Sequence, residues 1–310
     1  MQRIQALIPD WRHRCVTIDD EDSVNPEKQA LQKATADLRK SHLGNWLVDH
    51  AADLSVLLCL DSGTDLEAYY RAHLHLIGLN TRLDAAGRLV FLAHELAHVP
   101  QHPRFSNNRL FSPEDMLLLH RAREASAEAV ATRVLWQLRE LGIDEPWRAK
   151  LDTAYGDIAQ LFETNMHAAD SDDAELWATR SAFHQWFEVD WRLDIYDDLM
   201  LKTLARIAGD HIGMLPPSKW LSDSYLRDMS RYAGQRFLIE GDGQALMGAF
   251  GISWSASGNQ ARLDAILRQG RPGHGKATFG VRNLGEGTGL SASSSRPINI
   301  DPVQQNAGHR

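Results

Sequence analysis

The spacing of apolar residues along the chain predicts a mostly helical protein with a few short strands in its first third. Residues 15–18, 54–60 and 73–79 form short apolar or alternating runs of strand length. Apolar residues recur at helical spacing elsewhere, over residues 26–40, 43–52, 84–99, 112–141, 147–167, 173–208, 217–232 and 259–268. We therefore expect an α+β, mostly helical fold in which a small sheet near the amino terminus is followed by helices.

Residues at several helix boundaries support this interpretation. Asn25 before Pro26, and Ser112 before Pro113, are typical helix starts, because a polar cap is followed by proline at the first helical position. Gly142 is expected to end the helix that Pro113 begins. The long helix at 112–141 therefore has clear signals at both of its ends, whereas the neighbouring helices are predicted mainly from their apolar spacing.

One of the predicted helices carries the sequence His94-Glu95-Leu96-Ala97-His98. Histidines four residues apart lie on one helix face, so both imidazoles can reach the same ion. The opposite face is apolar and would bury the helix through Leu89, Leu92, Leu96 and Val99. Two imidazoles and a carboxylate are costly to bury there unless a partner satisfies them. We therefore interpret His94 and His98 as ligands of one Zn²⁺ ion per chain, with Glu95 as the general base.

A catalytic zinc site usually has three protein ligands, so a third is expected elsewhere in the chain. Glu124 and Glu128 lie one turn apart on the helix at 112–141, and the alanines around them would let that helix approach the histidines closely. The alternative is a solvated helix face on which these glutamates pair with Arg121 and Arg123.

Other candidates for the third ligand fit less well. A third histidine at the metzincin spacing would fall at position 104, which is Arg104. Pro100 breaks the helix between His98 and His102, so His102 would not stay in line with the first two histidines. Asp152 matches only the end of the aspzincin pattern.

The two motifs together resemble gluzincin zinc metallopeptidases. They also resemble a family of uncharacterised bacterial metallopeptidases that carry H-E-L-x-H-x-x-Q and a downstream R-x-x-E-A, here residues 94–101 and 121–125. The resemblance covers roughly residues 50–140. It implies His94, His98 and Glu124 as zinc ligands, Glu95 as catalytic base, and Glu128 as hydrogen-bond partner of a metal-bound imidazole. Many gluzincins have aspartate where Glu128 stands, so the choice between Glu124 and Glu128 as ligand stays open.

Peptide hydrolysis at such a site also needs a donor for the negative charge that develops on the carbonyl oxygen. Tyr196, His184 and Tyr155 are available downstream, and the sequence does not select among them. A substrate peptide is expected to lie as an added strand along residues 73–79. Cleavage specificity, endo- or exopeptidase action and oligomeric state do not follow from the sequence.

Composition narrows the function classes and the compartment. With 33 basic and 41 acidic residues the formal charge is −8, which argues against sequence-independent nucleic-acid binding. The chain has no signal-peptide pattern and no apolar run of membrane-spanning length. Cys15 and Cys59 lack the spacing of a disulfide framework, which favours free thiols and a reducing compartment. We therefore expect a cytoplasmic protein that contacts no membrane.

Three segments follow from these patterns. Residues 1–143 are expected to form a zincin-like metallopeptidase domain, residues 144–269 a helical subdomain that walls the cleft, and residues 270–310 a mobile tail rich in glycine and serine. The predicted function is a zinc-dependent metallopeptidase acting on a peptide or protein substrate. The alternatives are a non-catalytic helical scaffold with a zincin-like fold, and a zinc hydrolase of a non-peptide amide.

Overall fold

The computed structural model describes residues 8, 11–18, 20, 24–102, 111–168, 173–210, 221–253 and 259–270. In this part of the chain the fold is α+β and mostly helical, as predicted. The predicted tail lies outside the described residues from position 271 onward, and so does Arg104.

The first third of the chain forms the sheet and the helices that cover it. Its strands are β1 (Cys15–Thr17), β2 (Leu57–Asp61), β3 (Ala68–Arg71) and β4 (Leu76–Asn80). Its helices are α2 (Trp11–Arg14), α3 (Pro26–Leu38), α4 (His42–Asp53) and α5 (Ala85–His98), with the 3-10 turn η1 (Ala72–Leu74) before β4.

The four strands lie in the order β1-β2-β4-β3, with β2 and β4 parallel and both outer strands antiparallel. The expectation that residues 73–79 form an edge of the sheet is wrong, because β4 is an inner strand and the edge strands are β1 and β3. That run is also shorter than predicted. It begins with the turn η1, and His75 takes a left-handed conformation (φ 48°) before β4 starts at Leu76.

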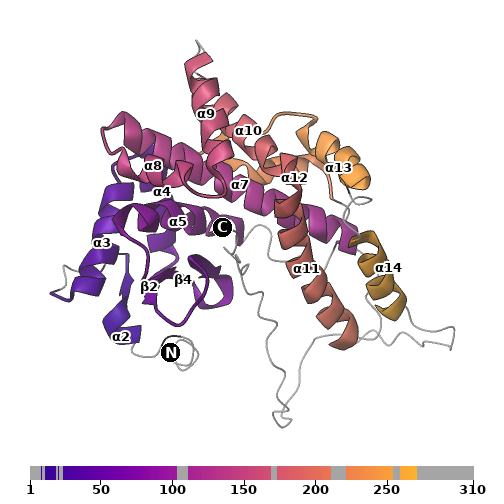
Figure 1. Cartoon of the computed structure of the whole chain (residues 1–310), viewed down its shortest axis with the longest axis horizontal. Coiled ribbons are helices and arrows are strands. Elements are labelled where there is room, and N and C mark those ends of the chain that lie inside the picture. Colours follow the sequence, from indigo (N-terminus) through magenta and orange to yellow (C-terminus); the bar gives the residue numbers. More distant parts are fainter. Residues whose placement is uncertain are drawn as a thin grey trace, which may run out of the picture.

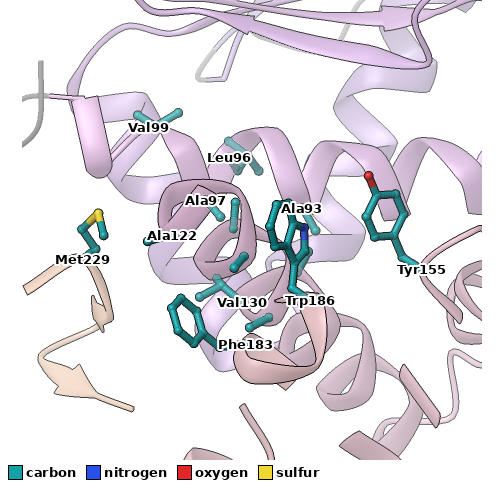
Figure 2. Packing of buried hydrophobic residues seen from close by; sticks show 14 of the residues in the cluster. Ala93, Leu96, Ala97, Val99, Ala122, Val130, Tyr155, Phe183, Trp186 and Met229 are labelled. Carbon is teal, nitrogen blue, oxygen red and sulfur yellow. The ribbon is translucent and has the colours of Figure 1, made fainter. Parts of the chain in front are cut away.

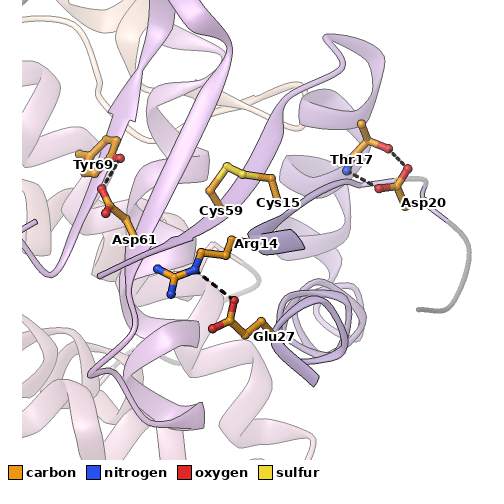
Figure 3. The surroundings of a disulfide bond; sticks show 8 residues. All are labelled: Arg14, Cys15, Thr17, Asp20, Glu27, Cys59, Asp61 and Tyr69. Atoms are coloured by element: carbon orange, nitrogen blue, oxygen red, sulfur yellow. Dashed lines mark hydrogen bonds and ion pairs between the residues drawn. A yellow bond between two sulfur atoms is a disulfide. The ribbon is translucent and has the colours of Figure 1, made fainter. Parts of the chain in front are cut away.

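The two cysteines form a disulfide bond across β1 and β2 (Figure 3). The expectation of free thiols is therefore wrong, and with it the argument for a reducing compartment. Cys15 and Cys59 are register partners on neighbouring antiparallel strands although 44 residues separate them in the sequence. Cysteine spacing alone could not show this, because the contact depends on how the strands pair.

The described residues that follow α5 are almost entirely helical. The long helix α7 (Pro113–Glu140) is followed by α8 (Glu145–Leu151), α9 (Gly156–Ala168), α10 (Ala174–Gln185), the 3-10 turn η3 (Trp186–Glu188) and α11 (Asp190–Asp210). Then come α12 (Asp223–Met229), the hairpin strands β5 (Arg231–Tyr232) and β6 (Gln235–Arg236), α13 (Asp242–Ser253) and α14 (Asn259–Gly270).

Several predicted helices are interrupted. The helix expected at 147–167 breaks over residues 152–155. The next helix begins at Gly156, where a Cβ would lie 2.2 Å from the backbone oxygen of Leu151. The helix expected at 173–208 is divided by η3, and the one expected at 217–232 is the shorter α12 followed by the hairpin. Strand β3 and helix α13 had no clear signal in the apolar pattern.

Helix α7 crosses the middle of the molecule and packs against α5 on one side and against α10 and α11 on the other (Figure 1). The contact between α5 and α7 is close because its side chains are small, including Ala93 and Ala97 of α5 and Ala122 of α7 (Figure 2). Phe183 and Trp186 belong to the same continuous core. This core holds the helix with the two histidines against the helix with the two glutamates.

Among the helices described, none combines the length and the apolar character needed to cross a membrane.

Candidate metal centre

Helix α5 begins and ends as its sequence predicts. The side chain of Asp84 caps it by accepting a hydrogen bond of 2.7 Å from the backbone nitrogen of Gly87. The helix ends at His98, just before Pro100. Its apolar face is buried, and its histidines therefore point towards α7 rather than into solvent.

The structure brings three of the predicted metal-site residues together. The Nε2 atoms of His94 and His98 lie 3.1 Å apart. One carboxylate oxygen of Glu124, Oε2, lies 3.6 Å from Nε2 of His94 and 3.5 Å from Nε2 of His98. Among the described residues, this is the cluster of histidine and acidic side chains whose donor atoms are close enough to share one ion.

The other ring nitrogen of each histidine, Nδ1, makes a hydrogen bond on the side away from the donor cluster. Nδ1 of His94 lies 2.9 Å from Oε2 of Glu128, which as a carboxylate can only accept a hydrogen bond. Nδ1 of His98 lies 2.9 Å from Oε1 of Gln101, whose amide nitrogen donates to the backbone oxygen of Arg123 and to the hydroxyl of Tyr232. Both Nδ1 atoms are therefore donors, and both Nε2 atoms carry lone pairs that face each other.

This arrangement fits a divalent metal ion. Two imidazole lone pairs and a carboxylate oxygen repel one another at 3.1–3.6 Å unless a cation lies between them. Tetrahedral zinc with ligands at about 2.0–2.1 Å places its ligand atoms about 3.3–3.4 Å apart, which is close to the mean of the observed separations. Two imidazoles and one carboxylate are also a donor set typical of catalytic zinc.

The sequence left open whether Glu124 or Glu128 is the third metal ligand. The contacts of the two side chains favour Glu124. Glu124 faces the two Nε2 atoms, whereas Glu128 contacts the far side of His94. Arg121 and Arg123, proposed as surface partners of these glutamates, pair with neither: Arg121 forms an ion pair with Asp197. Burial alone would raise the pKa of Glu124. The imidazoles of His98 and His94 outweigh that effect and hold the pKa well below its usual range.

Glu95 lies beside the donor cluster and is buried. It accepts a hydrogen bond from the backbone of Tyr70 in β3, which ties the carboxylate to the sheet edge. Burial raises the pKa of Glu95, and the neighbouring His94 and His98 oppose that effect. Its environment is typical of a carboxyl group that exchanges protons.

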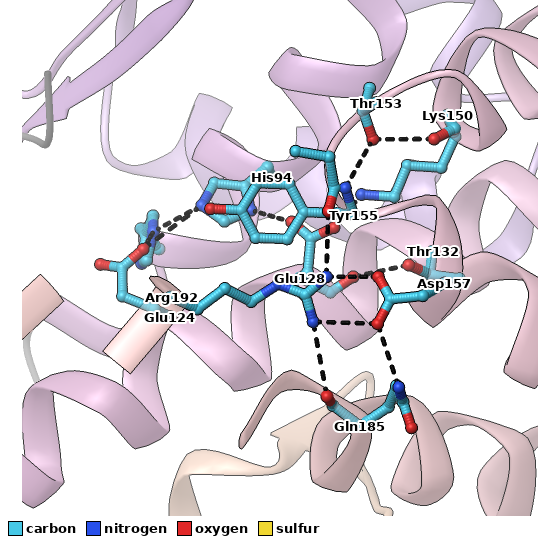
Figure 4. A network of polar contacts seen from close by, with 12 residues as sticks. His94, Glu124, Glu128, Thr132, Lys150, Thr153, Tyr155, Asp157, Gln185 and Arg192 are labelled. Carbon is cyan, nitrogen blue, oxygen red and sulfur yellow. Dashed lines mark hydrogen bonds and ion pairs between the residues drawn. The ribbon is translucent and has the colours of Figure 1, made fainter. Parts of the chain in front are cut away.

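A chain of polar contacts supports the cluster from the side of α8 (Figure 4). The side-chain nitrogen of Lys150 forms a buried ion pair with Oε1 of Glu128, whose other oxygen contacts His94. Burial and the charge of Arg192 lower the pKa of Lys150 to about 7, and the close carboxylate of Glu128 favours its charged form. Tyr155 lies next to this chain, with the guanidinium of Arg192 4.9 Å from its ring centre. The sequence interpretation missed Lys150, because a lysine in a helix carries no local sign of burial.

Of the three candidate oxyanion donors, Tyr155 and Tyr196 lie together and His184 lies elsewhere. The hydroxyls of Tyr155 and Tyr196 lie 2.9 Å apart, and both side chains are buried. Burial raises the pKa of Tyr196 well above its usual range, as do Tyr155, Glu124 and Glu95. His184 contacts Asp242, at 3.4 Å, and has no site residue among its charged neighbours.

His120 is a further buried residue that the sequence interpretation missed. It lies one helical turn before Glu124, and its ring centre is 5.8 Å from that of Tyr196. Its Nε2 has no hydrogen-bond partner in the part of the chain that the structure describes. Burial lowers the pKa of His120 to about 4. Its spacing from Glu124 and Glu128 could have indicated its place, since all three share one face of the helix. Asp152, by contrast, is exposed at the end of α8.

Comparison with known proteins gives one match. Residues 9–238 match the family described as "Putative metallopeptidase family (DUF6782)". No curated protein and no solved structure matches the chain. The family match runs from α2 to the end of the β5–β6 hairpin, so it includes the donor cluster, Lys150 and Tyr232. It confirms the resemblance to a metallopeptidase family, over more of the chain than the motifs that suggested it, and the chain belongs to this family.

Proposed function

We propose that the chain is a zinc-dependent peptidase in which His94, His98 and Glu124 hold the ion. The observation that carries this proposal is the pair of Nε2 atoms 3.1 Å apart, each fixed as an acceptor by the partner of its Nδ1. A zinc ion bound there would polarise a peptide carbonyl and lower the pKa of a water molecule to about 7.

Glu95 is the general base in this proposal. Its carboxylate takes a proton from the attacking water and passes it to the leaving amine. The hydrogen bond from the backbone of Tyr70 fixes the direction of the carboxylate, and burial raises its pKa towards the range that suits proton transfer near pH 7. The peptide lies along β3, because β3 is an edge strand of the sheet and packs against α5, the helix that carries the two histidines.

Tyr196 is the donor that we assign to the carbonyl oxygen. Its phenol keeps its proton at neutral pH, since burial raises its pKa, and the electrostatic effect of Glu124 and Glu95 on that pKa supports a position near the site. The hydroxyl of Tyr155, 2.9 Å away, fixes its orientation.

The test combines metal analysis with hydrolysis of a broad peptide mixture, followed by mass spectrometry. Wild type and Glu95→Gln should each carry about one zinc per chain, and His98→Ala should carry little. Glu95→Gln should cleave about 10²–10⁴-fold more slowly than wild type. Glu140→Gln is the matched control, because Glu140 is exposed at the end of α7.

Zinc-loaded wild type that cleaves no more than Glu95→Gln would refute the peptidase and favour the scaffold alternative. If that protein hydrolysed simple amides while Glu95→Gln did not, it would instead be a hydrolase of non-peptide amides.

A further inference from the structure

Helix α7 carries four arginines, and three of them pair with carboxylates. Arg121 pairs with Asp197, and the guanidinium groups of Arg133 and Arg139 each lie 2.6 Å from a glutamate oxygen, of Glu175 and Glu163 respectively. The fourth, Arg123, has no carboxylate oxygen within 4 Å in the described part of the chain.

Arg123 is nevertheless partly buried. Its Nε is buried and has no hydrogen-bond partner among the described residues. Its strongest electrostatic neighbours are the carboxylate of Glu124, beyond ion-pair distance, and the phenols of Tyr232, Tyr225 and Tyr70. The hydroxyl of Tyr70 is also buried and makes no hydrogen bond with a described residue. A charge removed from water in this way is costly unless a counter-ion reaches it.

The unpaired guanidinium lies beside the metal centre. Arg123 directly precedes Glu124, and its backbone oxygen accepts a hydrogen bond of 3.1 Å from Gln101, the residue that holds His98. Tyr70 belongs to the edge strand β3, and its backbone contacts Glu95. Arg123 and Tyr70 therefore flank the proposed cleavage site from the helix side and from the strand side.

The charge balance of the site indicates what would pair with Arg123. A divalent cation is balanced by Glu124 and Glu95, and Glu128 is balanced by Lys150. Arg123 is then one uncompensated positive charge next to the bound peptide. A planar guanidinium with several N–H groups matches the two oxygens of a carboxylate.

We propose that Arg123, together with the hydroxyl of Tyr70, binds a carboxylate of the substrate. Two parts of a peptide supply this chemistry, the α-carboxylate at its C-terminus and the side chain of an acidic residue. The subsite rests on the proposed peptidase function, since it selects the substrate of that site. Its binding chemistry can still be measured separately from cleavage.

Binding is measured by titration calorimetry on protein supplied with one equivalent of zinc, the state in which Glu124 and Glu95 are balanced, with three small probes. N-acetyl-phenylalanine carries an α-carboxylate, N-acetyl-glutamate α-amide carries only a side-chain carboxylate, and N-acetyl-phenylalanine amide carries neither. Wild type should bind one of the acids about 10- to 100-fold more tightly than the neutral amide. Arg123→Met should remove this preference, and Arg123→Lys should keep part of it. Arg139→Met, on the same helix, should leave it unchanged.

The acid that binds more tightly identifies the source of the carboxylate. Equal binding of all three probes, or no binding of any at 10 mM, overturns the proposal. So does a preference that survives in Arg123→Met.

A second measurement separates substrate binding from a structural role. Because Arg123 has no carboxylate partner among the described residues, Arg123→Met should leave the melting temperature unchanged or raise it. A melting temperature that falls in Arg123→Met and is restored in Arg123→Lys, with no difference in probe binding, would make Arg123 structural and overturn the subsite. If carboxylate preference is present but no peptide is cleaved, the subsite stands and the proposed function fails. If peptides are cleaved equally well with and without carboxylates, the function stands and the subsite fails.

Discussion

Replacing Lys150 by methionine should damage the protein far more than the loss of a typical lysine does. The side chains of Lys150 and Glu128 are only 3% and 4% exposed, and their ion pair lies directly behind His94 (Figure 4). Methionine has a similar length but no charge, so Lys150→Met leaves the Glu128 carboxylate buried with His94 as its remaining side-chain partner.

Breaking one side of a buried ion pair costs about 3–5 kcal/mol. We expect the lower part of this range for Lys150→Met, because Glu128 keeps its hydrogen bond with His94. Lys33→Met is the matched control: Lys33 pairs with Asp37 at 2.7 Å, but its side chain is 70% exposed. An exposed pair of this kind contributes at most about 1 kcal/mol.

The assay is urea unfolding of zinc-free wild type, Lys150→Met, Glu128→Gln and the double variant. The free energy of unfolding should fall in the double variant by at least about 1 kcal/mol less than the sum of the falls in the two single variants. The reason is that the double variant leaves neither charge without its partner. Zinc affinity, measured by competition with a chelator, should fall about 10- to 100-fold in Lys150→Met if Glu128 orients His94. Losses that add within about 0.5 kcal/mol, with unchanged zinc affinity, would refute the reasoning.

Three further outcomes follow from the same contacts. Gln101→Leu removes the acceptor for Nδ1 of His98, so zinc affinity should fall about 10- to 100-fold by chelator competition, whereas Gln160→Leu on the exposed side of α9 should not change it. Because burial lowers the pKa of His120 from 6.5 to about 4, protonation favours the unfolded chain, and stability is lost as the pH falls below 6.5. Between pH 7.5 and 5, zinc-free wild type should therefore lose about 2 kcal/mol more than His120→Leu in urea unfolding; parallel losses would contradict this. Reducing the disulfide, which spans 44 residues of sequence, should lower the free energy of unfolding by up to about 4 kcal/mol, and Cys59→Ser should show no further loss on reduction.

The sequence predicted the parts of the site that depend on local spacing. Helix α7 starts at its cap Ser112 and ends just before Gly142, and α5 starts at its cap Asp84, because capping and periodicity are properties of neighbouring residues. The same holds for the two motifs whose side chains meet in the donor cluster, since residues four apart on a helix share a face.

The parts that the sequence missed depend on contacts between distant segments. Lys150 reaches Glu128 from another helix, and Tyr232 reaches Gln101 across 131 residues. Only the folded chain brings such pairs together, and the residue types alone do not indicate it. His184 is an error of the opposite kind, a residue that the sequence suggested and the fold does not support. A histidine can serve as an oxyanion donor, but the fold puts this one beside Asp242. The boundaries of the three proposed segments stay predictions.

The continuity of α7 limits how the chain can be divided. The helix is 28 residues long, about 42 Å at 1.5 Å per residue, and three of its buried charges are neutralised by residues beyond position 143. A polypeptide truncated there would keep His94, His98 and Glu124 but would strip Arg121, Arg133 and Glu128 of their counter-charges. We therefore expect residues 1–143 alone to be less stable than the whole chain, because the helix that carries Glu124 depends on later helices for its counter-charges.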